Sequence, residues 1–449
     1  MKLIKSISIW FITNLFLLLF TFAAGVEDYE QLRLLIVIVN LLSLFVFFAL
    51  SLESLKPHKQ AYYSSKRLLV KLTYVSMLFL IVYNSIYLYY TNAFFEIGAV
   101  DTMEYHRWAT WMIELGLVES IQEFFNRGYP IDDLSAALIT SISYRIYPSP
   151  LMVNILNLVA GLITVLSIYR LSLNFMDRKF SYLAALSYGM SSFVLYAYST
   201  GLKESVFIMF VVLFFENIIV YFRNRAFNRL ALSLFFLVML YGFRPAVCAM
   251  IIVSVFIGFL FQKNRNRYAY ALIFFIIILL IYNVEEIMKL VEYYKIVTDA
   301  KNITSEQELK LSTFNIVASY LSSAIGPLPS FQPLVGREQQ AFYAVGLSFR
   351  VFLSIPFWVV LPKVLKDRNG LLVTMSLFVL MEMFILGLIL ESFELRFSLP
   401  HIPFIYILSF YGLYCLNRTK SISLNRFFKL SAVVIIVGML VLWNARFYI

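Results

Sequence analysis

Long apolar segments recur along the whole 449-residue chain, and each of them ends at charged or turn-forming residues. A helix needs about 20 apolar residues to cross the hydrocarbon core of a bilayer, where its backbone must satisfy its own hydrogen bonds. Hydrophobic residues make up 61% of the chain and charged residues 14%, whereas soluble domains are about 45–50% apolar and about 25% charged. The sequence therefore predicts an all-α, polytopic integral membrane protein without a large soluble domain.

The loops between the apolar segments carry short basic clusters, which mark cytoplasmic loops. Lys2 and Lys5 then place the N-terminus inside, and the alternation predicts about thirteen spans, with the C-terminus outside. The predicted spans are Ile7–Gly25, Leu32–Leu52, Leu69–Tyr90, Leu151–Leu171, Tyr182–Thr200, Glu204–Tyr221, Leu230–Phe243, Ala246–Phe261, Ala269–Asn283, Phe349–Leu365, Leu371–Leu390, His401–Cys415 and Leu430–Trp443.

The segment Ile131–Tyr147 is apolar but also carries Asp132, Asp133 and Arg145. It is either a further span or an amphipathic helix at the outer membrane surface, and the second interpretation keeps every later basic loop in the cytoplasm. The expected organisation has three parts. Residues 1–67 form two helices and a loop, residues 68–416 form the central transmembrane region with external loops at 92–150 and 285–345, and residues 417–449 form a last loop and helix.

The composition also excludes some classes of function. The net charge of +11 does not indicate nucleic-acid binding, because the basic residues orient helices and form no basic face with a reading motif. The two cysteines, Cys248 and Cys415, lie in apolar segments and are interpreted as core residues. Three histidines and these cysteines are too few for a zinc site. No cofactor is required, and a divalent metal between carboxylates stays an alternative.

Ionisable residues from four separate stretches fall on the external side in this topology. Such residues are costly at membrane depth, so their convergence indicates a functional site. Structural roles are the alternatives: a solvated carboxylate at a helix start, a local ion pair, a turn residue, or a basic side chain that reaches toward headgroups. The four groups are Asp101 with Glu104, Lys203 with Glu204, Arg244, and Glu394 with Arg396.

Motifs around these residues resemble those of the polyprenyl-phosphate-sugar-dependent membrane glycosyltransferases of the GT-C superfold, in the protein O-mannosyltransferase-like branch. They occur in the order of that family, spread over residues 68–416. One departure is that Asp101 and Glu104 are separated, where the family often has adjacent acidic residues. The matching stretches are Asp101–Ala109 (DTMEYHRWA), Gly128–Pro130 (GYP), Ser199–Ser205 (STGLKES), Tyr241–Ala246 (YGFRPA) and Glu394–Pro403 (ELRFSLPHIP).

The resemblance implies transfer of a sugar from a polyprenyl-phosphate donor to a hydroxyl of a glycan, lipid or protein, with inversion. Asp101 would be the general base, with Glu104 as the alternative base, and Glu204 would orient the acceptor or His106. Cationic side chains would hold the leaving phosphate, and aromatic rings would pack against the sugar. The cations are Lys203, Arg244 and Arg396, and the rings are those of Tyr105, Trp108 and Tyr129.

Two other functions stay open from the sequence. An O-antigen-type polymerase or ligase would be indicated by paired arginines in a long external loop, but residues 285–345 contain a single arginine, Arg337. A flippase or transporter of lipid-linked oligosaccharides would place polar groups along a path through the bundle. A chain rich in Ile, Lys, Asn and Tyr favours a bacterial plasma membrane, with the site on its extracytoplasmic side and a role in cell-envelope glycan synthesis.

Overall fold

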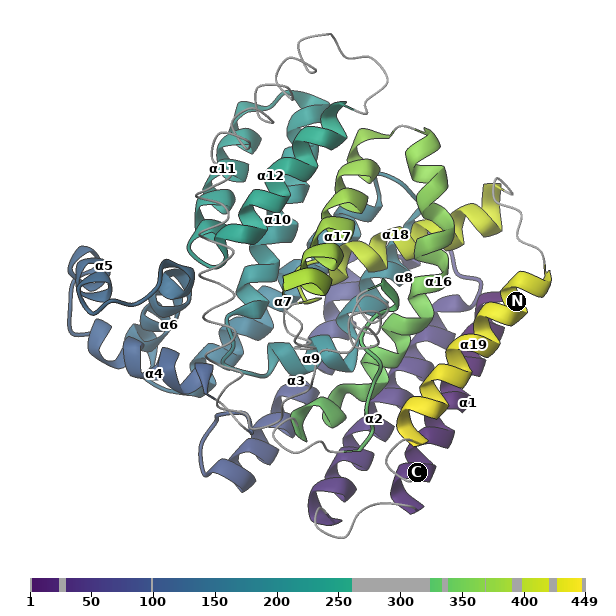
Figure 1. Cartoon of the computed structure of the whole chain (residues 1–449), viewed down its shortest axis with the longest axis horizontal. Helices are drawn as coiled ribbons and strands as arrows, with labels where there is room; N and C mark the ends of the chain where they lie inside the picture. The colour runs from purple at the N-terminus through teal and green to yellow at the C-terminus, as the bar shows by residue number, and fades with distance from the viewer. Residues whose placement is uncertain are drawn as a thin grey trace.

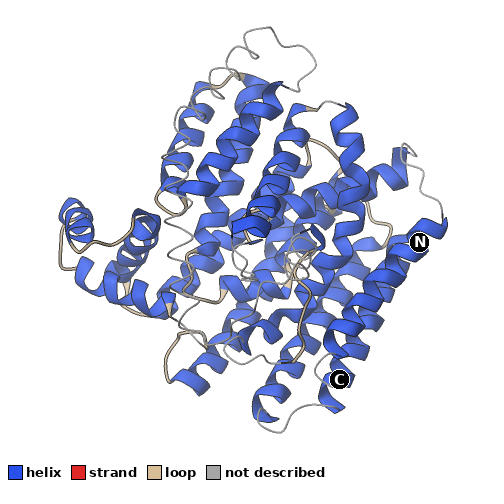
Figure 2. Cartoon of the chain, in the orientation of Figure 1, coloured by secondary structure: helices blue, strands red, loops and turns tan. Residues whose placement is uncertain are grey.

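The structure is a computed structural model that describes residues 2–23, 30–97, 100–260, 324–332, 338–367, 369–389, 398–419 and 426–445. Regular secondary structure in these residues is helical throughout (Figure 2). The α-helices are α1 (Lys2–Ala23), α2 (Glu30–Leu55), α3 (Ser65–Thr91), α4 (Asp101–Met112), α5 (Leu117–Asn126), α6 (Leu134–Ile146), α7 (Pro150–Ser172), α8 (Arg178–Gly189), α9 (Ser192–Tyr198), α10 (Glu204–Asn224), α11 (Phe227–Tyr241), α12 (Pro245–Leu260), α16 (Ala344–Asp367), α17 (Gly370–Ile389), α18 (Ile402–Tyr414) and α19 (Arg426–Ala445). Short turns of other helix types are η2 (Gln60–Tyr62), η3 (Ile131–Asp133), η4 (Glu338–Tyr343) and η6 (Cys415–Thr419).

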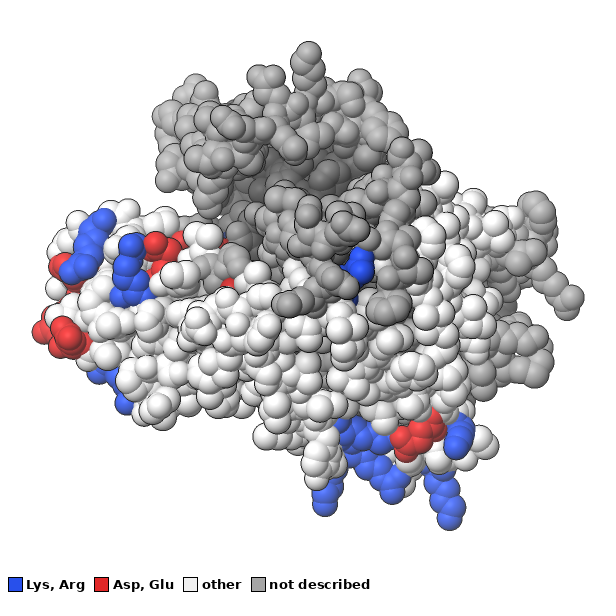
Figure 3. All heavy atoms as spheres, turned by 90° about the horizontal axis from the view of Figure 1, so that it is seen from below, with Lys and Arg blue, Asp and Glu red and all other residues white. Residues whose placement is uncertain are grey.

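Five apolar stretches in the described part of the chain are long enough to cross a bilayer as helices. Shorter apolar helices accompany them, and the face drawn in Figure 3 is largely uncharged between two groups of charged side chains. The all-helical prediction is therefore confirmed, and the structure fits a polytopic membrane protein, while the span count stays a prediction. The five stretches are Leu32–Leu55, Ser65–Thr91, Pro150–Ser172, Glu204–Asn224 and Gln339–Asp367.

Helix α7 connects the layers of the bundle, because it packs against α3, α8 and α10. On one side α10 packs against α11, and α12 packs against α17; on the other, α16 packs against α18, and α1 against α2 (Figure 1). One hydrophobic core runs from Trp10 in α1 to Leu440 in α19. The three parts expected from the sequence therefore share a single core.

Helices α4, α5 and α6 lie together at one side of the bundle, at the left of Figure 1. Helix α6 covers most of the ambiguous segment Ile131–Tyr147, and its 13 residues are flanked by η3 and an extended residue. A straight helix of this length spans about 20 Å, less than the roughly 30 Å of a bilayer core. Helix α18 has the same length, so the interpretation of this segment as a surface helix stays a prediction.

The predicted single span Tyr182–Thr200 is wrong, because the chain breaks there into α8 and α9. Every residue from 181 to 200 is buried, and a broken helix is tolerated at membrane depth only inside protein. The break lets α16 approach the start of α9 at Gly346, whose backbone N–H donates to Ser192 Oγ over 2.8 Å. A Cβ at Gly346 would lie 2.7 Å from the backbone nitrogens of Ser192 and Phe193.

The predicted span Ala269–Asn283 lies outside the described residues, as does most of the expected external loop 285–345. The other predicted spans coincide with single helices, whose ends differ by a few residues from the predicted bounds.

The contact between α7 and α9 provides a test of the packing. A Cβ at Gly161 in α7 would lie 2.3 Å from Cε2 of the Tyr198 ring. We expect Gly161→Ala to destabilise the protein by about 1–3 kcal/mol through overpacking and to lower its Tm in detergent. At Gly438 in α19 a Cβ meets nothing within 4 Å, so Gly438→Ala should keep or raise the Tm. Equal Tm values for the two variants would contradict this packing.

Candidate functional site

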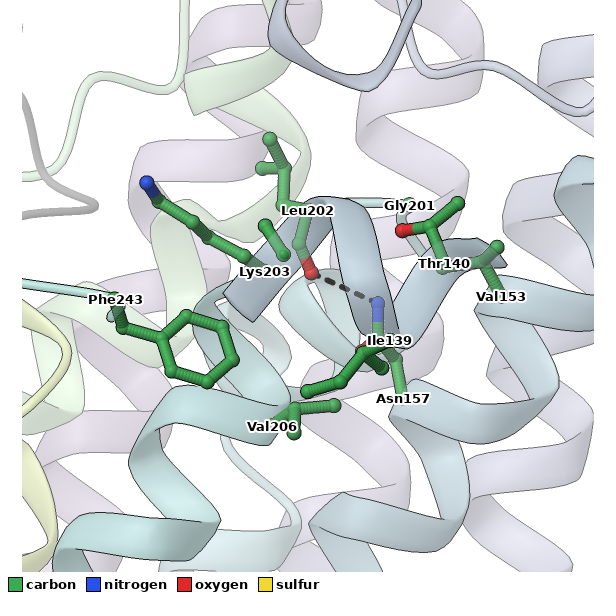
Figure 4. Close-up of a pocket in the computed structure, with 10 residues that line it drawn as sticks. Ile139, Thr140, Val153, Asn157, Gly201, Leu202, Lys203, Val206 and Phe243 are labelled. Carbon is green, nitrogen blue, oxygen red and sulfur yellow. Dashed lines mark hydrogen bonds between the residues drawn. The ribbon is translucent and has the colours of Figure 1, made fainter. Parts of the chain in front are cut away.

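The turn between α9 and α10 is the centre of the candidate site. The side-chain amide of Asn157 in α7 donates to the carbonyl of Thr200 over 2.6 Å and to that of Leu202 over 2.9 Å, and Figure 4 shows the second of these bonds. Gly201 lets α4 approach the turn, since a Cβ there would lie 2.3 Å from Thr102 Cγ2. The turn is thus held from α7 and from the start of α4, and it presents Lys203 and Glu204.

The turn between α11 and α12 is brought to the same place by α6. The backbone N–H of Ser135 donates to the carbonyl of Gly242 over 3.1 Å, and its hydroxyl donates to the carbonyl of Met239 over 3.1 Å. A Cβ at Gly242 would lie 2.4 Å from Ser135 Oγ, so glycine permits this docking. Arg244 follows two residues later and reaches α10.

Glu204 and Arg244 form a buried ion pair, with Arg244 Nη2 2.9 Å from Glu204 Oε1. Their side chains are 3% and 15% exposed. Glu204 is the first residue of α10, where the helix dipole favours a carboxylate. Its second oxygen, Oε2, is buried and has no hydrogen-bond partner in the described part of the chain. The structure therefore brings together two residues that were predicted from stretches 40 positions apart.

Lys203 belongs to a second group beside this pair. Its ammonium forms an ion pair with Asp133 at the start of α6, and it lies 5.8 Å from the centre of the Tyr105 ring. The Tyr105 hydroxyl donates to the same carboxylate over 3.3 Å. Lys203 and Tyr105 are thus neighbours, and Asp133, to which sequence reasoning had given no site role, binds both of them.

The other residues of α4 that were predicted to form the site contact different groups. Asp101 opens the helix and is half-buried, and it interacts electrostatically with Glu96. Glu104 forms an ion pair with Arg107, whose side chain is 61% exposed. His106 Nδ1 lies 2.6 Å from the Tyr144 hydroxyl, and burial lowers the pKa of the His106 imidazole. These contacts place neither Glu104 nor His106 against the Glu204–Arg244 pair.

Tyr129 packs inside an aromatic cluster between α4 and α5. Its ring centre lies 4.9 Å from that of Trp108 and 5.1 Å from that of Phe124. Trp108 is 5% exposed and Phe124 is fully buried. The structure thus gives these rings a packing role in the α4–α5 unit. Arg396 and Glu394 lie outside the described residues.

A buried carboxylate that sequence reasoning missed lies next to these groups. Glu96, in the loop between α3 and α4, is 5% exposed, and its Oε1 accepts a hydrogen bond from the Thr102 hydroxyl. Burial raises the pKa of its carboxyl group, and the charges of Asp101 and Glu204 raise it further. The signal available in the sequence was a lone acid inside the apolar, aromatic stretch 93–100.

Deeper in the bundle, three ionisable side chains come from α16, α17 and the start of α18. Glu382 Oε2 and His401 Nδ1 are 3.0 Å apart, and both side chains are at most 3% exposed. Arg350 is 2% exposed and donates to the carbonyl of Ile325 over 2.9 Å. The charges of Arg244 and Glu382 interact, so this cluster adjoins the Glu204–Arg244 pair.

A small pocket opens beside the α9–α10 turn, between α6, α7 and α10 (Figure 4). Its cavity volume is about 10 Å³, room for about one water molecule, and it is lined mainly by apolar side chains, with Lys203 and Thr140 among them. Ligand pockets commonly enclose about 300–1,000 Å³, so the pocket is smaller than a sugar donor needs. The described residues contain no group of three or more His, Cys, Asp or Glu that could hold a metal ion, so the alternative of a divalent metal finds no ligand set there.

Comparison with known proteins adds no assignment. Models of protein families give no match to the chain, and a search of curated protein sequences finds none that is similar.

The Glu204–Arg244 pair can be tested by its effect on stability. Arg244→Met leaves a buried carboxylate without its partner, and removal of one partner from such a pair costs about 3–5 kcal/mol. We expect a large drop in Tm in detergent for Arg244→Met, and a smaller drop for the double variant Glu204→Met/Arg244→Met. If the drop in Tm of the double variant equals the sum of the drops of Arg244→Met and Glu204→Met, the two side chains are not coupled.

A second test uses the pH dependence of stability at His106. Its pKa is lowered in the folded protein, so the unfolded chain takes up a proton first as the pH falls below about 6.5. This residue therefore lowers stability as the pH falls from about 6.5 to its folded pKa. In His106→Gln we expect a smaller loss of Tm between about pH 7.5 and pH 5.5 than in the wild type. An unchanged pH profile would contradict the burial of a neutral imidazole.

Proposed function

We propose that the protein is a membrane glycosyltransferase that moves a sugar from a polyprenyl-phosphate-linked donor to an acceptor hydroxyl on the extracytoplasmic side. The observation that carries the proposal is the buried Glu204–Arg244 pair beside the Lys203–Asp133 pair. Carboxylates and fixed cations in a water-poor site are the groups that such a transfer needs. They come from α6, α10 and the α11–α12 turn, so the fold assembles them from distant stretches.

In this proposal the cations act on the leaving group. As the bond between the sugar and the phosphate breaks, negative charge grows on the phosphate oxygen that leaves with the lipid. Arg244 and Lys203 would stabilise this charge, and a guanidinium can meet two phosphate oxygens at once. Arg396 would be a third cation, on the strength of its motif alone. A carboxylate of the site takes the proton of the attacking hydroxyl.

The proposal also names the partners of the protein. The lipid of the donor would lie in the bilayer beside the apolar helices, and a glycan, lipid or protein would supply the acceptor hydroxyl. The proposed setting is the plasma membrane of a bacterium and the synthesis of cell-envelope glycans.

One observation favours a second candidate function, a flippase or transporter of lipid-linked oligosaccharides. Glu382, His401 and Arg350 are buried between α16, α17 and the start of α18, and buried ionisable residues often line transport paths. The two functions differ in their products, because a transporter moves the donor between leaflets and leaves the sugar on its lipid.

The test of the proposal is sugar transfer by purified protein in vesicles, with a panel of polyprenyl-phosphate-linked hexoses and pentoses. Loss of a donor that stabilises transition-state charge costs about 10²–10³-fold in rate, so Arg244→Ala should lose that much. The transfer rate of Arg244→Lys should lie between those of Arg244→Ala and the wild type, because lysine keeps the charge but cannot donate two parallel hydrogen bonds as a guanidinium does.

Arg127→Ala is the matched control for this assay, because Arg127 pairs with Glu123 at an exposed position of α5, and it should keep wild-type transfer. Wild-type rates in Arg244→Ala at equal protein level would remove Arg244 from the mechanism. Movement of the donor between leaflets without any sugar transfer would instead support the transporter.

A further inference from the structure

Glu96 carries a buried carboxylate oxygen without a partner. Its Oε1 accepts a hydrogen bond from Thr102, but its Oε2 is buried and has no hydrogen-bond partner among the residues that the structure describes. A carboxylate oxygen that is buried and unpaired costs free energy, because it has lost water and gained no donor. Such an atom points to a ligand that supplies the missing hydrogen bond.

A second unpartnered carboxylate oxygen belongs to the same site. Glu204 is 2% exposed, Arg244 binds its Oε1, and no described residue hydrogen-bonds its Oε2. The charges of Glu96 and Glu204 interact, so the two carboxylates lie near each other. Their backbones are brought together where Gly201 contacts Thr102, the residue that binds Glu96. Two neighbouring buried side chains thus each carry a carboxylate oxygen that lacks a donor among the described residues.

Asp101 differs from both of them. It is half-buried at the first position of α4, where a carboxylate is favoured by the helix dipole without any catalytic role. Its charge nevertheless interacts with that of Glu96. Asp101 can thus change the proton affinity of Glu96 from a position that need not touch the substrate.

We propose that Glu96 is the carboxylate that accepts the proton of the attacking hydroxyl, and that Asp101 is a positioning residue that acts on Glu96 through its charge. This inference rests on the proposed glycosyltransferase function and names its base. In the step, the acceptor oxygen bonds to the anomeric carbon of the sugar. The bond from that carbon to the phosphate oxygen breaks, and its electron pair leaves with the lipid phosphate. The proton of the hydroxyl moves to Glu96 Oε2.

The surroundings of Glu96 make its carboxylate a stronger base than an exposed one. Burial raises the pKa of Glu96, and so do the negative charges of Asp101 and Glu204, while the hydrogen bonds from Thr102 and from its own backbone N–H lower it. The other titratable side chains near Glu96 are Tyr87 of α3 and Tyr196 of α9, which are neutral near pH 7. Removal of the Asp101 charge should therefore lower the pKa of Glu96.

The first experiment measures Glu96 without any substrate. Infrared difference spectroscopy during a pH titration detects the C=O stretch of protonated carboxyl groups in the detergent-purified protein. Glu96→Gln should remove one band that titrates above the exposed carboxylates, and Asp101→Asn should shift that band to lower pH. Glu114→Gln, which replaces an exposed carboxylate in the turn after α4, should change neither. A spectrum that is identical in Glu96→Gln, or a band that Asp101→Asn leaves in place, overturns the inference.

The second experiment measures sugar transfer across pH with the same variants. Loss of a general base costs about 10²–10⁴-fold, so Glu96→Gln should lose that much. Asp101→Asn should keep a larger fraction of the activity and move the acid limb of kcat/KM to lower pH. If Glu96→Gln does not fold, the shift in Asp101→Asn decides the matter, because Asn can still start the helix.

The two proposals fail in different ways. Wild-type transfer together with full activity in Glu96→Gln contradicts the role of Glu96 and leaves the glycosyltransferase intact. A strong loss in Asp101→Asn with no shift of the acid limb would make Asp101 the base and would overturn the role of Glu96. A wild-type protein that transfers no sugar contradicts the glycosyltransferase, and the role of Glu96 with it.

Discussion

A bilayer offers polar groups no water, so each polar group in this bundle has to find its partner inside the protein. The structure meets this constraint with single Asn and Ser side chains placed on apolar helices. Asn40 of α2 donates to the carbonyl of Ala341 over 2.6 Å and accepts from the N–H of Val345 over 3.2 Å. Asn157 holds two carbonyls of the α9–α10 turn in the same way. Irregular backbone thus occurs where an amide or hydroxyl on a neighbouring helix can bind it.

The candidate site depends on these contacts. Without the hydrogen bonds of Asn157 the turn that carries Lys203 and Glu204 would have buried carbonyls with no donor. With the turn fixed, Glu204 lies at the start of α10, where Arg244 meets it. A buried ion pair is weak evidence for stability, because the free energy of desolvating the two charges offsets their attraction. A pair that contributes little to stability is better explained by a functional role. The unpaired oxygens of Glu96 and Glu204 fit the same interpretation.

The local order of the fold was largely predictable, and the places where prediction failed have a common cause. Hydrophobic length and helix signals predicted most long helices to within a few residues at each end. The same signals missed the break between α8 and α9, because both pieces are apolar and the break is stabilised by α16, which is far along the chain. A similar reason separates Glu104, which was predicted as a site residue, from Glu96, which the sequence analysis did not single out. Both are acids near the start of α4, and only packing makes one paired and partly exposed and the other buried.

The sequence by itself indicated that the segments are apolar enough for a lipid environment and that they are helical. It also identified the ionisable side chains at the ends of those segments. These follow from local quantities, since apolar length and charge can be read residue by residue. Only the tertiary structure decided that Arg244 binds Glu204, that Asp133 binds Lys203, and that Glu96 lies buried beside them. Those contacts join residues that are far apart in the chain, and an ionisable side chain takes its properties from the burial and the charges around it. The sequence identifies the candidate residues, and the packing of the helices decides which of them come into contact.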